Sequence, residues 1–79
     1  MIMTGNANIS YYLYETAEND SLLGQYLTYG IRVNEGEELY ALYRDISTDR
    51  ERVTRLVGRL NREQIAPYQL PELLEDFLP

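Results

Sequence analysis

The change in hydrophobic periodicity near residue 47 is the feature that most limits how this chain can fold. Before it, apolar and polar residues alternate, which is typical of strands with one buried face. After it, apolar residues recur every three or four positions, which is typical of amphipathic helices. Seventy-nine residues suffice for one domain only, so strands and helices must share a single small core.

The alternating part predicts three strands, at residues 9–16, 23–33 and 39–46. The polar clusters AENDS (17–21) and NEGEE (34–38) predict the turns between them, and short turns favour an antiparallel meander. Gly30 in the longest strand indicates a bulge or a close backbone approach. One side of that strand is expected to face the core: Leu23, Leu27, Tyr29, Ile31 and Val33.

The first helix is predicted over residues 49–63. Thr48 and Glu51 match a capping box, in which the hydroxyl and the carboxylate each bind a free backbone N–H. Gly58 costs up to about 1 kcal/mol relative to alanine and would allow close packing on the sheet. The stripe expected to face the core consists of Val53, Leu56, Val57, Leu60 and Gln64.

A second helix is predicted to begin at Pro71, a residue suited to the first helical position. Its apolar residues follow a helical spacing: Leu70, Leu73, Leu74, Phe77 and Leu78. So short a helix must dock, and its own sheet is preferred over a groove on another molecule. The prediction is an α+β domain spanning 1–79, ordered β-β-β-α-α, with both helices on one sheet face and residues 1–8 loosely ordered.

The composition excludes most catalytic chemistry. Histidine, cysteine and lysine are all absent, which removes nucleophilic triads and zinc sites, and the scattered glycines form no phosphate loop. We therefore expect no enzyme, cofactor or metal site, and interpret the acidic NEGEE segment as a solvated turn rather than a cation site. With no signal-like start, no membrane-length apolar run and a net charge of −6, the chain is expected to be cytoplasmic.

The eight tyrosines raise the question of which ones are buried. The alternation places Tyr11 and Tyr29 in the core, and Tyr12, Tyr14 and Tyr26 on the opposite, uncovered sheet face, with Tyr40 possible beside them. Exposed tyrosines are typical of protein interfaces, so these three are the candidate surface for a protein partner or a second copy in a homodimer. Cross-strand tyrosine pairs that only stabilise the sheet, and stacking on single-stranded nucleic acid, are the alternatives.

The first helix also carries a basic ridge opposite its apolar stripe, formed by Arg52, Arg55, Arg59 and Arg62. An ordinary solvated face is the preferred interpretation, followed by an acidic protein partner. Nucleic-acid binding is the alternative function, although the net charge and the absence of lysine argue against it.

Four segments together resemble a family of short bacterial proteins of unknown function, found mainly in clostridia and related Firmicutes: YYLYE, YGIRV, DISTDRERVTRLVGRLN and PYQLPELLEDFL. The resemblance covers residues 11–78. It implies a cytoplasmic, non-enzymatic protein and supplies no substrate or partner. Many relatives have a histidine near PYQL where this chain has Gln69, so histidine chemistry is not implied at that position.

Overall fold

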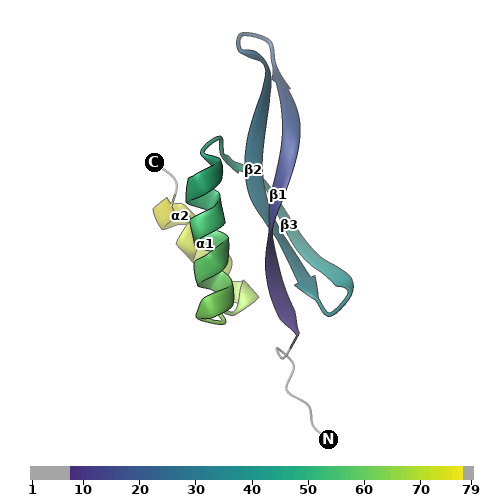
Figure 1. Cartoon of the computed structure of the whole chain (residues 1–79), viewed down its shortest axis with the longest axis vertical. Helices are drawn as coiled ribbons and strands as arrows, with labels where there is room; N and C mark the ends of the chain where they lie inside the picture. The colour runs from purple at the N-terminus through teal and green to yellow at the C-terminus, as the bar shows by residue number, and fades with distance from the viewer. Residues whose placement is uncertain (1–7, 78–79) are drawn as a thin grey trace, which may run out of the picture.

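The computed structural model describes residues 8–77 and confirms the predicted α+β fold (Figure 1). The expectation for residues 1–8 falls almost wholly outside this range. Three antiparallel strands in the order β1-β2-β3 form one sheet, and both helices lie on the same side of it. The elements are β1 (Ile9–Asp20), β2 (Gly24–Glu35), β3 (Glu38–Ser47), α1 (Arg50–Arg62), the short 3-10 helix η1 (Pro67–Gln69) and α2 (Leu70–Phe77).

The first hairpin is longer than the sequence predicts. β1 and β2 pair in unbroken register from Ile9 opposite Glu35 to Asp20 opposite Gly24, so the predicted turn at 17–21 is wrong. The Asp20 carboxylate accepts hydrogen bonds from the backbone N–H groups of Leu22 (2.7 Å) and Leu23 (3.0 Å). Gly24 closes the loop with φ 78°, a conformation that favours glycine. The end of AENDS therefore makes the turn, and its beginning extends the strand.

The core lies between the sheet and the two helices. Tyr11 and Tyr29 are buried there, as predicted, with exposed fractions of 2% and 8%. The α1 stripe predicted to face the sheet is confirmed for its helical members, because Val53, Leu56 and Leu60 are buried and Val57 packs against them. The remaining buried apolar residues are Ile31, Val33, Leu70 and Leu74.

Leu23 and Leu27 were predicted to face the core, and this is wrong. They are 75% and 51% exposed, and Leu22 in the loop is 92% exposed. The alternation places them on the correct side of β2, but the end of the β1–β2 hairpin projects beyond both β3 and the helices (Figure 1). Periodicity identifies the side of a strand and carries no information on how far the covering layer reaches.

Pairing of β2 with β3 is irregular. The two-residue turn at Gly36 and Glu37 fits the predicted hairpin, and Gly36 has φ 63°. The register then shifts twice, between Val33 and Asn34 and between Tyr29 and Ile31. At the second shift a Cβ on Gly30 would lie 1.9 Å from the Tyr43 carbonyl oxygen, so the predicted close backbone approach is confirmed.

Helix α1 differs from the prediction at two points. Its N-cap is Asp49, whose carboxylate accepts from the Arg52 N–H at 3.2 Å, so the capping box of Thr48 with Glu51 is wrong. Asp49 has the extended backbone that a cap requires, and a carboxylate caps as well as a hydroxyl. Gly58 is exposed, and apart from the adjoining backbone of α1 no described atom comes within 4 Å of a Cβ placed there, so it does not serve close packing on the sheet.

Helix α2 begins at Leu70, one residue before the predicted Pro71, because η1 runs directly into it. It docks on its own domain as expected, burying Leu70 and Leu74, while Leu78 lies outside the described residues. The Arg52 guanidinium donates to the Phe77 carbonyl oxygen and stacks 4.2 Å from the centre of the Phe77 ring. Within residues 8–77, no helix is long and apolar enough to span a membrane.

Candidate interaction surface

The sheet face away from the helices carries a row of exposed side chains across all three strands. Tyr12 on β1 lies opposite Arg32 on β2, and Arg32 lies opposite Leu42 on β3. Tyr12 is 50% exposed and Leu42 is 38% exposed. The Arg32 Nε donates to the Asn34 Oδ1 at 3.1 Å, which holds the guanidinium along its own strand. One cation therefore lies between two apolar groups.

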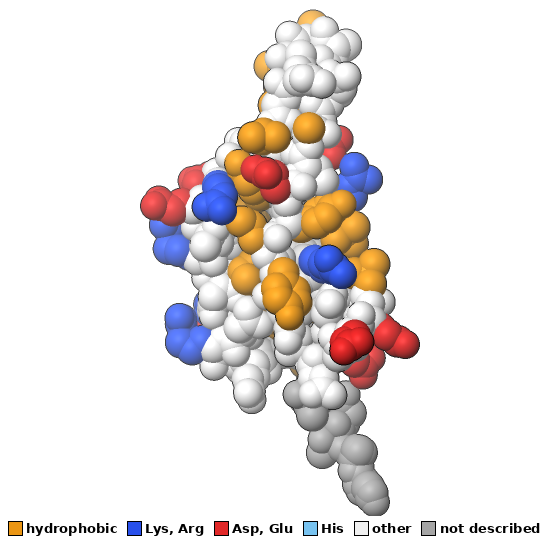
Figure 2. Space-filling view, turned by 45° about the vertical axis from the view of Figure 1, so that its right-hand side comes forward, with side chains coloured by type: hydrophobic (Ala, Val, Ile, Leu, Met, Phe, Trp, Pro, Cys, Tyr) orange, Lys and Arg blue, Asp and Glu red, His pale blue; other side chains and the backbone are white. Residues whose placement is uncertain are grey.

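Two further residues extend this row along the strands. Tyr14 is half-buried and lies directly opposite Gly30, and Leu39, 56% exposed, lies opposite Asn34. We call this group the open-face patch: Tyr12, Tyr14, Arg32, Leu39 and Leu42. Figure 2 shows hydrophobic side chains gathered over the body of the molecule, with charged side chains among and around them.

Tyr40 does not belong to the row. It is the additional residue at the register shift between Ala41 and Leu39, and it is 55% exposed. Because it is the additional residue, it has no partner opposite it on β2, and we leave Tyr40 out of the open-face patch.

Tyr26 shares a sheet face with Tyr12 and Tyr14 but lies apart from them. It pairs with Glu18, near the projecting end of the hairpin. Burial, followed by the negative charges of Asp45, Glu18 and Asp20, raises the pKa of the Tyr26 phenol. The three predicted interface tyrosines therefore do not form one continuous surface.

Polar groups fill the space between Tyr26 and the patch. The fully buried Thr28 donates from its hydroxyl to the Asp45 carboxylate at 2.7 Å, and Asp45 itself has φ 56°. Arg44 on β3 bonds to Glu18 on β1 at 3.0 Å. This polar strip marks the limit of the apolar surface.

The predicted arginine ridge is only partly available. Arg52 turns toward the end of α2, as described above. Arg55 lies 3.6 Å from the Glu51 carboxylate, and the Arg59 Nε lies 3.4 Å from that of Glu63. Arg62 is exposed at the end of α1. Alternating charges of this kind are typical of a solvated helix surface.

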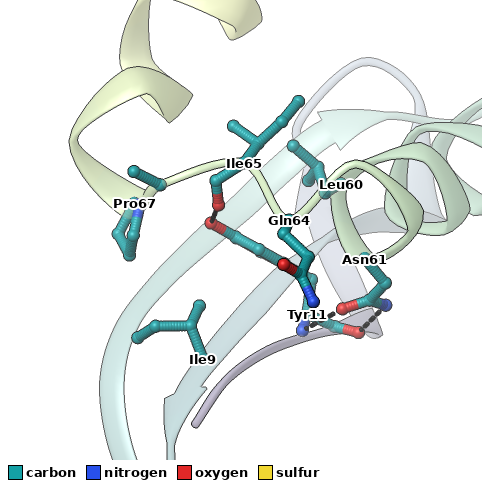
Figure 3. Close-up of a pocket in the computed structure, with 8 residues that line it drawn as sticks. Ile9, Tyr11, Leu60, Asn61, Gln64, Ile65 and Pro67 are labelled. Carbon is teal, nitrogen blue, oxygen red and sulfur yellow. Dashed lines mark hydrogen bonds between the residues drawn. The ribbon is translucent and has the colours of Figure 1, made fainter. Parts of the chain in front are cut away.

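A cavity of about 170 Å³ lies where the end of α1 meets β1 (Figure 3). The Tyr11 side chain lines it, and the Tyr11 hydroxyl donates to the Ile65 carbonyl oxygen. The residues that line it are Ile9, Tyr11, Leu60, Asn61, Gln64, Ile65, Ala66 and Pro67. None of these described residues is acidic, basic or a thiol, and the volume is below the roughly 300 Å³ at which small-molecule sites begin.

Two features of the surface were missed by the sequence reasoning. Arg32 and Leu42 complete the row with Tyr12, and the alternation of β2 and β3 contained the signal for both. Asn61 is the second: its side chain accepts from the Tyr11 N–H and donates to the Tyr11 carbonyl, both at 2.9 Å (Figure 3). No periodic pattern marks such a contact across 50 residues. No group of three acidic side chains that would hold a metal ion occurs within residues 8–77.

Comparison with known proteins identifies a family and no activity. A family described only as being of unknown function (DUF6514) matches residues 3–79, so the chain belongs to that family. No curated protein and no solved structure matches the chain.

Proposed function

We propose that this protein of a family without known function is a small non-enzymatic interaction module that binds another protein through the open-face patch. The observation that carries the proposal is the row Tyr12–Arg32–Leu42, in which two exposed apolar groups flank a cation on the sheet face away from the helices. Tyrosine and arginine are enriched at the centres of protein interfaces. Contiguous apolar surface on a small monomer indicates a contact site.

The chemistry of the patch indicates the kind of partner. Its apolar members would pack against aliphatic or aromatic side chains of the partner, and Arg32 would donate to a hydrogen-bond acceptor among them. The adjoining β2–β3 turn is acidic, with exposed Glu35, Glu37 and Glu38. We therefore infer a partner with an apolar centre and basic residues at the side that meets this turn.

A catalytic role has less support. The whole chain lacks histidine, cysteine and lysine, and the lining of the cavity offers no acid–base pair. Nucleic-acid binding through the arginine ridge, the alternative, is also weakened, because Arg52 engages α2 while Arg55 and Arg59 are paired with acids. Few cations remain free on that helix to contact phosphates.

The test is capture from an extract of the native cell with matched variants. Bait protein carrying Tyr12→Ser with Leu42→Ser removes the apolar groups on both sides of Arg32. Bait carrying Arg55→Ser with Arg59→Ser makes the same number of changes on exposed α1. Mass spectrometry identifies what each bait retains, and circular dichroism verifies that each is folded.

We expect a protein that is retained by the unmodified bait and by the α1 variant, and lost by the sheet variant. Retention by all three would refute the proposal. If the captured material is lost only with the α1 variant, and its retention by the unmodified bait falls steeply with salt, the result would instead support nucleic-acid binding.

A further inference from the structure

The outer edge of β1 is free over a long and regular stretch. Asn61 binds both backbone groups of Tyr11, so the Tyr11 N–H and C=O point away from β2. In an antiparallel strand the two sides alternate, so Leu13, Glu15, Ala17 and Asn19 also point outward. In the described part of the chain, Asn61 covers the first of these edge positions and no strand pairs with the other four.

The two edges of the sheet differ. β3 carries two register shifts and a left-handed Asp45, and irregularities of this kind protect an edge from pairing. β1 pairs with β2 in continuous register over all twelve residues, so its edge carries no register shift. Its charges are sparse and all acidic: Glu15, Glu18 and Asp20. This edge is therefore a template for another strand.

Thr16 lies at the centre of that edge. Its hydroxyl oxygen is the one buried side-chain polar atom without a hydrogen-bond partner within residues 8–77. A buried polar group left unpaired costs about 1–3 kcal/mol. A rotation about χ1 would turn this hydroxyl, which its own chain encloses, toward a second strand, where threonines that face each other can hydrogen-bond.

We propose that two copies of this protein pair through β1, antiparallel, in a register that places Thr16 opposite Thr16 of the second copy. The two sheets become one sheet of six strands, with both helical layers on the same face. Directly opposite pairs are then Leu13 with Asn19, Tyr14 with Glu18 and Glu15 with Ala17. No two like charges face each other directly, and all four outward-pointing residues of each copy make ladder bonds. A register centred on Glu15 would oppose two carboxylates.

The same register gives the projecting hairpin a neighbour. The loop Ser21–Leu23 of one copy comes level with Ile9 and Tyr11 of the other, two residues that line the cavity. The exposed loop leucines thus come level with apolar side chains of this recess, among them Ile9. Backbone groups of β1 make this pairing, so the dimer does not require the proposed partner, although Tyr12 and Tyr14 of the open-face patch lie on the same strand.

The experiment uses single cysteines, because the natural chain contains none. In this register the Thr16 Cα atoms are about 4.5 Å apart, within the range that a disulfide spans. Ala17 residues of the two copies lie diagonally, about 7–8 Å apart, which is too far. Thr16→Cys and Ala17→Cys proteins are treated with oxidised glutathione and separated on a non-reducing gel. The molar mass of the unmodified protein is measured by light scattering over a range of concentrations.

We expect a dimer mass, a strong disulfide dimer from Thr16→Cys and little from Ala17→Cys. Ala17→Pro, which removes an outward N–H from an edge strand, should give a folded monomer by circular dichroism. The open-face variant Tyr12→Ser with Leu42→Ser should remain dimeric. A monomer mass at every concentration would overturn the dimer, and stronger cross-linking at Ala17 than at Thr16 would overturn the register.

Discussion

Replacement of Gly30 by alanine should destabilise the protein severely. The added methyl group would lie 1.9 Å from the Tyr43 carbonyl oxygen and 3.0 Å from the Arg44 Cα, both of which are backbone atoms. Ordinary van der Waals contact begins at 3.4 Å, so β3 would have to move away from β2. Rotation of a side chain cannot relieve this contact.

The loss of stability can be set from the cost of overpacking a folded protein. Overpacking of a core costs about 1–3 kcal/mol, and we place Gly30→Ala at the upper end because backbone must shift. A chain of this length has a total stability of roughly 4–12 kcal/mol. For a small domain, each kcal/mol lowers the melting temperature by about 4–8 °C. At about 3 kcal/mol the expected decrease is therefore about 12–24 °C.

Gly58→Ala is the matched control, because the same methyl group is added at an exposed helical site where no described atom beyond the adjoining backbone of α1 lies within 4 Å. It should stabilise the protein by up to about 1 kcal/mol through helix propensity alone. Urea unfolding monitored by circular dichroism gives both free energies. If Gly30→Ala proves as stable as the unmodified protein, the close approach of β3 at this position is wrong.

Three further changes test separate contacts. Asn61→Ala should lower the free energy of unfolding by about 1–2 kcal/mol and speed amide exchange at Tyr11, since two hydrogen bonds are lost; exchange at the unmodified rate would contradict this. Asp20 accepts from the backbone of its loop, which holds its pKa below the ordinary 3.8, so its stabilisation is complete above that value and is lost as the pH falls through the lower folded pKa. The stability difference between the unmodified protein and Asp20→Ala should therefore be constant near neutral pH and shrink in acid, and a pH series of urea titrations measures it. Arg52→Ala should cost about 0.5–1 kcal/mol through lost stacking on α2, and an unchanged urea midpoint would show that this contact contributes nothing.

Much of the fold was predictable because its signals are local. The period of two identified all three strands, the period of 3.6 identified both helices, and the side of Tyr11 and Tyr29 followed from simple alternation. The errors at Leu23 and Leu27 arose because burial depends on how far the helices reach along the hairpin, which is a tertiary property. The observed N-cap of α1 differs from the predicted one because Thr48 and Asp49 are adjacent residues that both suit this position.

The candidate surface was predictable only in part, because it also depends on tertiary arrangement. Alternation correctly placed Tyr12, Tyr14 and Tyr26 on the uncovered side of the sheet. The separation of Tyr26 from the others depends on the register of two strand pairs, which the alternation of apolar and polar residues does not reveal. Alternation also puts Arg32 on that side, and the register shows that Tyr12 and Leu42 lie directly opposite it.

The strand order β1-β2-β3 has a consequence for how the chain folds. Each strand pairs with its neighbour in sequence, so most contacts are local, and proteins with local contacts fold quickly. Asn61, which covers the edge of β1 at Tyr11, comes 50 residues later in the chain. During synthesis from the N-terminus, β1 and β2 are therefore made before Asn61, the residue that covers the edge of β1. Until α1 is made and docks, the edge of β1 is open from Tyr11 onward, and in that interval a nascent chain is most exposed to pairing with the wrong strand.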